Sequence, residues 1–316
     1  DGQAEEIYIG DEVPTGYAHY AKAKDDARVY TIAGYTKSSL DKTPNDLRDR
    51  RLLTFESDKL ARLTLRARGQ EIEFGKDAQN DWAILKPRTL RADGSQVEDL
   101  IRKLQDARMD AYATPEDLKK FASAFASGTR VATVTISSQG GDQQMEIRRD
   151  WEKNYYARTS VAEGVHKVGS DLDEAVDKGV DDFRNRKLFS FGWSDPTSVE
   201  VRRPDGAATY TKSGEKWMAG GKEMDAASVQ ALIDKLRDLS ATAFPATGGG
   251  GELVIEPTVT SSDGKRVEKV TITGAGGKFY AKRDGEPSIY ELDAAAVEEL
   301  QKAAREVKEQ APSGDN

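Results

Sequence analysis

The chain of 316 residues has no cysteine and only two histidines. Without cysteine it can form no disulfide, no thiolate nucleophile and no Cys-ligated zinc or iron–sulfur site. It also has no run of about 18 apolar residues, the length that a membrane-spanning helix needs. No charged, apolar and small-residue leader opens it. These absences exclude several kinds of chemistry and leave either side of a membrane open as the location.

Charge is abundant, with 47 Lys and Arg against 55 Asp and Glu, which gives a formal net charge of −8. A protein that binds nucleic acid must neutralise many phosphates, so this balance predicts no nucleic-acid partner. Apolar residues make up 37% of the chain, which is enough for cores of modest size and argues against disorder throughout. The length predicts two or three domains, with two as the working count.

An internal repeat runs along the chain at an offset of 136 residues. The run Asp-Leu-Arg-Asp-Arg-Arg-Leu-Leu-Thr-Phe at 46–55 matches Asp-Phe-Arg-Asn-Arg-Lys-Leu-Phe-Ser-Phe at 182–191. The tripeptide Tyr-Ala-Lys at 20–22 matches Tyr-Ala-Arg at 156–158 and returns in a third, partial copy at 280–282. A repeat of this length indicates a tandem array of similar folding units.

The pattern within one unit predicts strands followed by a helix. Alternating apolar residues at 60–66, 71–74 and 82–85 have the period of half-buried strands. Three aspartates then precede apolar i, i+3, i+7 stripes at the position of a helix N-cap, namely Asp93, Asp225 and Asp293. The predicted fold class is therefore α+β, built from tandem repeated two-layer modules of three to four antiparallel strands followed by one helix.

The chain starts at Asp1 and in the middle of a repeat, so we expect a trimmed product whose leader or membrane anchor lies upstream. The predicted domains follow the repeat. They are a partial module at 1–52 that lacks its upstream half, a first βββα module at 53–126, a second-half module with an acidic helix at 127–188, a second βββα module at 189–246, a C-terminal second-half module at 247–309 and a disordered tail at 310–316.

The Leu-Arg-Asp-Arg-Arg-Leu-Leu-x-Phe run, the tryptophan strand and the Asp-capped helix resemble the bacterial family catalogued as domain of unknown function 4340. The resemblance covers nearly the whole chain. It implies a membrane-anchored extracytoplasmic protein, often encoded beside ABC transporter subunits and the auxiliary component of gliding-type transporters. The family brings no activity and no cofactor. The matching positions are Leu47, Arg48, Arg50, Leu52, Phe55, Phe183, Arg184, Arg186, Leu188 and Phe191.

A search for reactive groups predicts no catalytic residue, no cofactor and no metal site. His19 and His166 occupy different strand positions of the repeat, and a metal site needs several converging ligands. The Ser-x-x-Lys spacing at 213–216 falls in a polar hairpin turn, where both side chains are expected to be solvated. The acidic run at 171–182 is interpreted as the solvated face of a helix.

Basic residues that recur with the repeat are the most informative charges. One interpretation is structural, because cations at the end of a helix offset the negative end of its dipole. The other is that they contact a carboxylate-bearing partner or an anionic lipid surface. Most tryptophans are expected to pack in strands, but Trp193 follows a flexible glycine. The candidate partner-binding residues are Arg48, Arg50, Arg51, Arg184, Arg186, Lys187 and Trp193.

The leading functional hypothesis is a non-enzymatic extracytoplasmic accessory or scaffold protein that binds a protein partner in a membrane complex, such as one of the ABC transporter type. Tandem modules offer a long surface for such contacts. Membrane attachment is expected only through an anchor outside this sequence. The alternative is a module that binds a glycan, lipid or peptide for delivery to a transporter. An enzyme ranks third, since no spacing indicates a pocket with converging polar groups.

Overall fold

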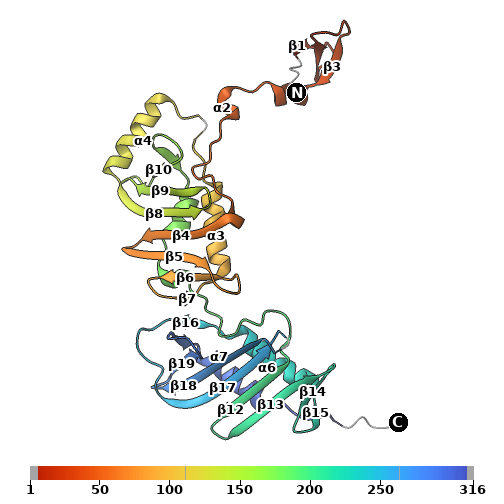
Figure 1. Ribbon diagram of the computed structural model, residues 1–316, viewed down its shortest axis with the longest axis vertical. Helices are drawn as coiled ribbons and strands as arrows, with labels where there is room; N and C mark the ends of the chain where they lie inside the picture. Colours follow the sequence, from red (N-terminus) through yellow and green to blue (C-terminus); the bar gives the residue numbers. More distant parts are fainter. Residues whose placement is uncertain (1–5, 111, 263, 312–316) are drawn as a thin grey trace. The chain divides into compact units, whose positions relative to one another are not determined.

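The structure is a computed structural model that describes residues 6–110, 112–262 and 264–311. It is a mixed α+β protein with antiparallel sheets, as the sequence predicts (Figure 1). Contacts group the chain into two compact units, one of residues 1–55, 103–131 and 143–173, the other of residues 56–102, 132–142 and 174–316. Residues 312–316 of the predicted disordered tail, and residues 1–5 of the predicted partial module, lie outside the described ranges.

The first unit contains a three-stranded antiparallel sheet of order β1-β2-β3. Helix α1 contacts β2 and β3, yet none of its seven residues, all of them described, is buried. The elements are β1 (Ile7–Glu12), β2 (Ala18–Ala23), β3 (Tyr30–Ala33), α1 (Gly34–Leu40) and α2 (Pro44–Leu47).

The first unit also contains three strands in which β10 pairs with both β9 and β11. Thr114 caps helix α4: its hydroxyl accepts from the main-chain nitrogen of Asp117, and its own main-chain nitrogen donates to the Asp117 carboxylate in a capping box. The helix then packs Phe125 against Tyr156 and Val165 in a small apolar cluster. The elements are α4 (Pro115–Ser127), β9 (Gly141–Arg149), β10 (Tyr155–Thr159), β11 (His166–Val168) and α5 (Ser170–Val176).

Strands of the second unit follow the order β8-β4-β5-β6-β7. The alternation that predicts strands at 60–66, 71–74 and 82–85 is confirmed in β4, β5 and β6. Asp93 caps the following helix by accepting hydrogen bonds from the main-chain nitrogens of Ser95 and Gln96. The elements are η1 (Ser57–Lys59), β4 (Leu60–Ala67), β5 (Gln70–Lys76), β6 (Trp82–Lys86), β7 (Leu90–Arg91), α3 (Gly94–Asp106) and β8 (Thr129–Ser138).

The second unit also contains a nine-stranded sheet of order β15-β14-β13-β12-β17-β18-β19-β20-β16. Its portion β15-β14-β13-β12-β17 repeats the order β7-β6-β5-β4-β8, so the sequence repeat is a repeat of sheet topology. The strands are β12 (Ser198–Arg203), β13 (Gly206–Ser213), β14 (Lys216–Ala219), β15 (Lys222–Met224), β16 (Ala241–Ala243), β17 (Glu252–Ser261), β18 (Arg266–Ala275), β19 (Lys278–Arg283) and β20 (Ile289–Leu292).

Two helices, α6 (Ala226–Asp238) and α7 (Ala294–Glu306), pack against each other and on the nine-stranded sheet (Figure 1). Asp225 and Asp293 cap them, as predicted. Their stripes bury Leu232 and Leu300 completely, and full burial of one such side chain contributes about 1.5–3 kcal/mol. On the polar side of the sheet, Glu256 accepts hydrogen bonds from Arg202 and Thr271. The second unit therefore has the predicted two-layer design.

The aspartates that cap α3 and α6 also make matching main-chain hydrogen bonds to the half-module that follows. The main-chain nitrogen of Asp93 donates to the carbonyl of Phe183 over 2.8 Å, and that of Asp225 donates to the carbonyl of Lys308 over 2.9 Å. Gln310, placed by the sequence in a disordered tail, likewise donates from its main chain to Glu223 over 2.9 Å. Each βββ segment is thus tied to the end of the half-module that follows it.

The acidic run differs from its prediction. Instead of one solvated helix it forms the short α5 and a 3-10 turn, η2 (Val180–Asp182). Asp173 is buried rather than solvated. The pattern of acidic residues alone did not reveal that the helix ends at Val176, before the loop that leads to η2.

Candidate functional site

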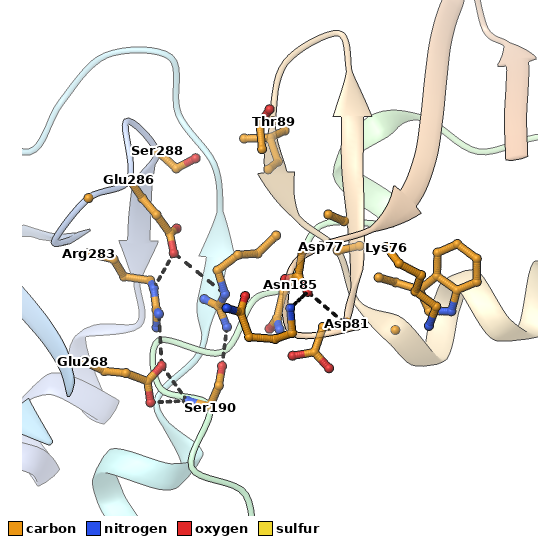
Figure 2. Close-up of a pocket in the computed structure, with 18 of the residues that line it drawn as sticks. Lys76, Asp77, Asp81, Thr89, Asn185, Ser190, Glu268, Arg283, Glu286 and Ser288 are labelled. Atoms are coloured by element: carbon orange, nitrogen blue, oxygen red, sulfur yellow. Dashed lines mark hydrogen bonds and ion pairs between the residues drawn. The ribbon is translucent and has the colours of Figure 1, made fainter. Parts of the chain in front are cut away.

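A cavity of about 1190 Å³ lies within the second unit (Figure 2). Its lining comes from the β5–β6 turn, from β7 and the residues around it, from Asn185 and Ser190, from the β17–β18 turn and from the β19–β20 turn. Most of the side chains drawn around it in Figure 2 are polar or charged. This cavity could not be predicted from local sequence patterns, because the segments that line it are far apart along the chain.

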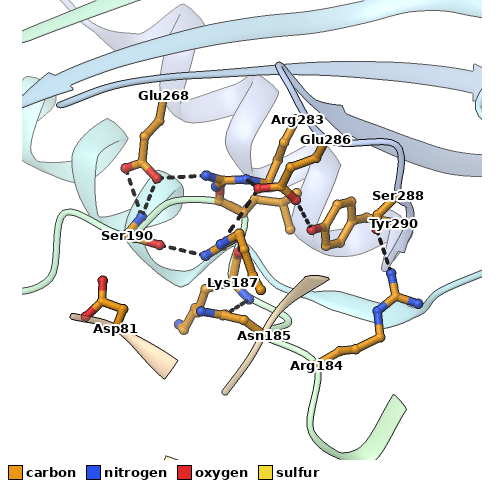
Figure 3. Close-up of polar contacts among 12 residues, drawn as sticks. Asp81, Arg184, Asn185, Lys187, Ser190, Glu268, Arg283, Glu286, Ser288 and Tyr290 are labelled. Carbon is orange, nitrogen blue, oxygen red and sulfur yellow. Dashed lines mark hydrogen bonds and ion pairs between the residues drawn. The ribbon is translucent and has the colours of Figure 1, made fainter. Parts of the chain in front are cut away.

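Arg283 is the centre of the charged network on one side of the cavity (Figure 3). Its Nη2 donates to Glu268 over 3.0 Å and its Nε donates to Glu286 over 2.7 Å. Its remaining nitrogen donates to the main-chain carbonyl of Leu188. Glu268 in turn accepts from the main-chain nitrogen of Ser190 over 2.9 Å. The network therefore fixes segment 188–190 against β18 and β19.

Arg91 enters the same network from the end of β7. It donates to the carbonyl of Lys187 over 2.9 Å and to the hydroxyl of Ser190 over 2.6 Å, and its Nε lies 3.8 Å from Glu286. Burial, together with the nearby positive charge of Arg283, lowers the pKa of Arg91. Two arginines thus balance two carboxylates, which is the requirement for holding charges in a low-dielectric site.

Tyr290 completes the network by donating from its hydroxyl to Glu286 over 2.6 Å. Burial is the main cause that raises the pKa of Tyr290 to about 12, and the negative charge of Glu286 adds to it. The phenol therefore stays protonated at neutral pH. Glu286 accepts from Arg283 and Tyr290 together, so its oxygens are already engaged with the protein.

The rim of the cavity is formed by the β5–β6 turn. Asp77 accepts hydrogen bonds from the main-chain nitrogens of Gln79 and Asp81, which shapes the turn. Asp81 lies 3.9 Å from Arg266. The Lys76 ammonium lies 4.1 Å from the centre of the Trp82 ring, within the range of a cation–π contact.

The second basic run, 184–187, has structural contacts for each of its three predicted residues. Arg184 is only 6% exposed, lies 3.6 Å from the centre of the Phe244 ring and donates to Asp181 and Ser288. Arg186 donates to the carbonyl of Thr242 over 2.7 Å. Lys187 donates to the carbonyl of Arg237 in the last turn of α6 over 3.2 Å. These placements favour the structural interpretation, with α6 as the helix whose end is neutralised.

The first basic run, 48–51, is exposed at every one of its predicted residues. Arg51 makes a two-pronged contact with Asp49, at 3.0 and 2.6 Å. The main chain at Arg51 forms a bridge to Arg108, which matches the bridge from Lys187 to Ser240 in the second run. The two runs therefore share a main-chain role, and Arg48 and Arg50 keep their guanidinium groups at the surface.

Trp193 is 93% exposed. The loop that carries it is held by Arg237, which donates to the carbonyl of Gly192 over 2.8 Å and to the carboxylate of Asp195 over 3.0 Å. Two other tryptophans, at 82 and 217, are buried in strands as expected, whereas Trp151 is 89% exposed on the β9–β10 turn. The expectation of packing is thus right for Trp82 and Trp217 and wrong for Trp151, while Trp193, the one singled out for exposure, is exposed.

Sequence reasoning missed the network of Arg91, Glu268, Arg283 and Glu286. Charged residues in strands usually lie on a solvated face, so the sequence alone did not single out these four. Register places Ala23 and Thr159 in the other copies where Arg283 stands in this one. Arg283 is charged where the other two copies of the repeat have small residues, and this difference between copies is the signal that could have pointed to the network.

These features define a tandem-repeat α+β protein whose sheets carry helices on one face. The chain belongs to the family described as Domain of unknown function (DUF4340), which matches residues 1–123 and 148–254 as two copies. No curated protein and no solved structure matches the chain.

Among the helices of residues 6–110, 112–262 and 264–311, none has the length and apolar character that crossing a membrane requires. Within the same ranges, no group of three or more His, Asp and Glu side chains is placed to hold a metal ion. His166 is buried, its Nε2 lies 2.9 Å from the carbonyl oxygen of Glu163, and burial lowers its pKa.

Proposed function

We propose that the chain is a non-enzymatic accessory or scaffold protein of an extracytoplasmic compartment that binds a protein partner in a membrane complex of the ABC transporter type. The observation that carries the proposal is the display of Trp193. An indole at 93% exposure leaves a large apolar surface in water. Burying that surface against a partner is favourable, and tryptophan is among the side chains that contribute most to protein interfaces.

The loop around Trp193 is also prepared for binding. Arg237 holds the residues on both sides of the indole, at Gly192 and Asp195. Its guanidinium is itself fixed, since it lies 5.3 Å from the centre of the Phe191 ring. A loop that is ordered before binding loses less conformational entropy in the complex, so more of the contact energy appears as affinity.

The cavity network supports the non-enzymatic part of the proposal. A general base has to be free to take a proton from a substrate. Glu268 accepts from Ser190 and Arg283, and Glu286 accepts from Arg283 and Tyr290. Carboxylates that are held by arginines in this way serve to fix strands together.

The test is crosslinking and affinity purification of the membrane-anchored protein from its native membrane. We expect recovery of transporter-type subunits with the wild-type chain and a loss of about tenfold or more with Trp193→Ala, the effect of removing an interface anchor. Trp151→Ala is the matched control, because that tryptophan is also exposed. Equal recovery with both variants, or recovery of no protein partner, would contradict the proposal.

A second candidate function, binding of a lipid or an apolar peptide, draws on a smaller cavity in the first unit. It measures about 530 Å³ and lies beside α4, between Leu118 and Ala122 of the helix and residues 158–165. Leu118 and Val161 are partly exposed there. Protection of this groove by an acyl chain in hydrogen exchange, with unchanged exchange around Trp193, would favour this candidate over the first.

A further inference from the structure

Helix α4 is an addition to the repeated fold. It lies beside β10, where the ring of Phe121 is 5.6 Å from that of Tyr156 (Figure 1). The matching residue of the C-terminal copy is Tyr280, in the repeated Tyr-Ala-basic tripeptide. There the connector between β16 and β17 passes over the ring, since a Cβ added at Gly248 would lie 3.2 Å from it. A short connector is therefore enough to cover this position, and the fold does not require a helix of 13 residues there.

Helix α4 also adds little to the core. Phe125 is the one buried residue among its 13, all of them described, and Leu118 remains 39% exposed. Leu118 and Ala122 instead form one wall of a cavity of about 530 Å³, and residues 158–165 form the other wall, with Val161 among them. We call this cavity the α4 groove. Its volume lies within the ~300–1,000 Å³ that is usual for ligand sites.

Arg158 brings a positive charge to the α4 groove. Its Nη2 donates to Glu146 over 3.1 Å, and its guanidinium lies 5.1 Å from the centre of the Phe125 ring. Arg130 and Arg148 also donate to Glu146, over 3.1 and 2.8 Å. Three guanidinium groups thus share one carboxylate, which leaves a local surplus of positive charge in a chain whose formal net charge is −8.

The surplus is available at Arg158. Arg148 also lies 3.3 Å from the carbonyl oxygen of Phe125, in the last turn of α4, where a cation offsets the negative end of the helix dipole. The side chain of Arg158 is 59% exposed. Its hydrogen bond to Glu146 uses one of the five N–H donors of a guanidinium. The donors that remain suit the oxygens of a phosphate or carboxylate.

Glu163 also lines the α4 groove, from the exposed turn between β10 and β11. Its carboxylate reduces the attraction for an anion without reversing it, because the groove and the cluster beside it together hold three arginines and two glutamates. Ser160 adds a hydroxyl that accepts from the main-chain nitrogen of Gln144 over 2.9 Å, so its own O–H can be donated to a ligand. The polar end of the groove therefore favours an anionic group.

We propose that the α4 groove binds a single-chain lipid that has an anionic headgroup. The acyl chain lies between α4 and the β10–β11 turn, where it is removed from water, and the headgroup accepts hydrogen bonds from Arg158. A peptide fits less well, because its main-chain N–H and C=O groups would have no partners along aliphatic walls. The source is a lipid monomer, since the groove is concave and a bilayer surface cannot enter it.

This inference rests on the second candidate function, lipid binding, and adds the charge of the headgroup and the residue that recognises it. It does not involve Trp193. Equal binding of anionic and zwitterionic lipids would keep lipid binding and overturn the inference. Binding of neither lipid would remove both.

The test titrates the full chain with lysophosphatidylglycerol, which is anionic, and with lysophosphatidylcholine of the same acyl chain, which is zwitterionic, both below their critical micelle concentrations. Amide hydrogen exchange is followed in 115–127 and 159–165. We expect saturating lysophosphatidylglycerol to slow exchange by about tenfold or more and to bind about tenfold more tightly than lysophosphatidylcholine, the effect of one charge-assisted hydrogen bond. Non-specific attraction would give the opposite order, because the chain is acidic overall.

Glycerol phosphate, which has the charge but no acyl chain, is the control for the groove. We expect it to leave exchange unchanged in both segments. Protection by glycerol phosphate alone would overturn the proposal in favour of a simple phosphate site.

Two matched variants test the role of the guanidinium. Arg158→Gln is expected to weaken lysophosphatidylglycerol binding about tenfold and to leave lysophosphatidylcholine binding unchanged. Arg130→Gln also removes a partner of Glu146, but from outside the groove lining, and should change either affinity by less than about twofold at physiological salt. Unchanged exchange in β9 shows that both variants are folded. Equal losses in the two variants, or unchanged binding in Arg158→Gln, overturn the proposal.

Discussion

Sheet β1-β2-β3 and strands β18-β19-β20 share a register but differ in what covers them. Ala21 and Ala281 are buried in both, and each lies opposite an isoleucine, Ile9 or Ile272. The C-terminal copy is flanked by β17 and covered by α7, whereas α1 buries none of its own residues. The register of a strand pair determines the face on which a side chain lies, and the neighbouring strand and helix determine whether that side chain is buried.

The difference extends to charge. Arg283 and Ala23 occupy matching positions, opposite Val270 and Ile7. A guanidinium can be held at the covered position because Glu268 and Glu286 are fixed around it at 3.0 and 2.7 Å. In a partly buried site such interactions are stronger than in water, and loss of one partner is correspondingly costly.

The largest expected effect is a loss of stability on removal of the Arg283 guanidinium, the charge that the first sheet lacks. Arg283→Met leaves Glu268 and Glu286 without their arginine, and we expect a loss of about 3–5 kcal/mol in the free energy of unfolding. Urea unfolding followed by the fluorescence of the buried Trp217 measures it. Lys282→Met, at an exposed neighbouring position, is the control and should change stability by about 0.5 kcal/mol or less. Equal losses in both variants would show that Arg283 is not a structural centre.

The next effect compares the two isoleucines directly. Ile272→Ala should cost about 2–4 kcal/mol, because it leaves a cavity in a closed core. Ile9→Ala should cost about 1 kcal/mol or less, because Ile9 is only partly covered. Urea unfolding reports the first change, and amide exchange in residues 18–23 reports the second. A cost at Ile9 as large as at Ile272 would mean that the β1 face is already covered in solution.

Much of this architecture could be predicted from sequence, because local patterns determine it. Alternation fixed the strands at 60–66 and 82–85, and a carboxylate before an apolar stripe identified the caps at Asp225 and Asp293. The sequence left open whether βββ segments and second halves share a sheet. Pairing such as β12 with β17 joins residues that are far apart in the chain, so no local pattern encodes it.

The candidate sites were less predictable for the same reason. The repeated basic runs look alike in sequence, yet Arg184 is enclosed by Phe244, Asp181 and Ser288 while Arg48 is exposed. The role of a charged side chain depends on what later segments bring beside it. Trp193, by contrast, was singled out because Gly192 precedes it, and that glycine has a φ of 61°, a conformation that favours glycine.

The matched arginines give the third prediction. Arg184→Ala removes a stacked, hydrogen-bonded guanidinium and should cost about 2 kcal/mol in the free energy of unfolding. Arg48→Ala should cost about 0.5 kcal/mol or less. Urea unfolding of the two variants beside the wild-type chain measures both. If Arg48 costs as much as Arg184, the two copies of the basic run have the same structural role.

The smallest expected effect is a pH dependence that separates Tyr290 from its match, Tyr30. The folded chain raises the pKa of Tyr290 to about 12, whereas the unfolded value is about 10. The resulting stability is fully present below pH 10 and is lost as the pH rises towards 12. Tyr290→Phe should lower stability by about 1 kcal/mol at pH 8, through loss of the hydrogen bond to Glu286.

The same variant should also flatten the decline in stability above pH 10, since phenylalanine has no proton to lose. Tyr30→Phe is the matched comparison: the hydrogen bond that its phenol donates to Asp26 over 2.7 Å also raises the pKa of Tyr30, but at 43% exposure solvent screens this contact, so we expect a much smaller change in the decline. Urea unfolding at intervals from pH 8 to pH 11 distinguishes the two. An unchanged decline in Tyr290→Phe would show that another group titrates there. A decline flattened as much in Tyr30→Phe as in Tyr290→Phe would show that the phenol of the first sheet is as strongly held as that of the last.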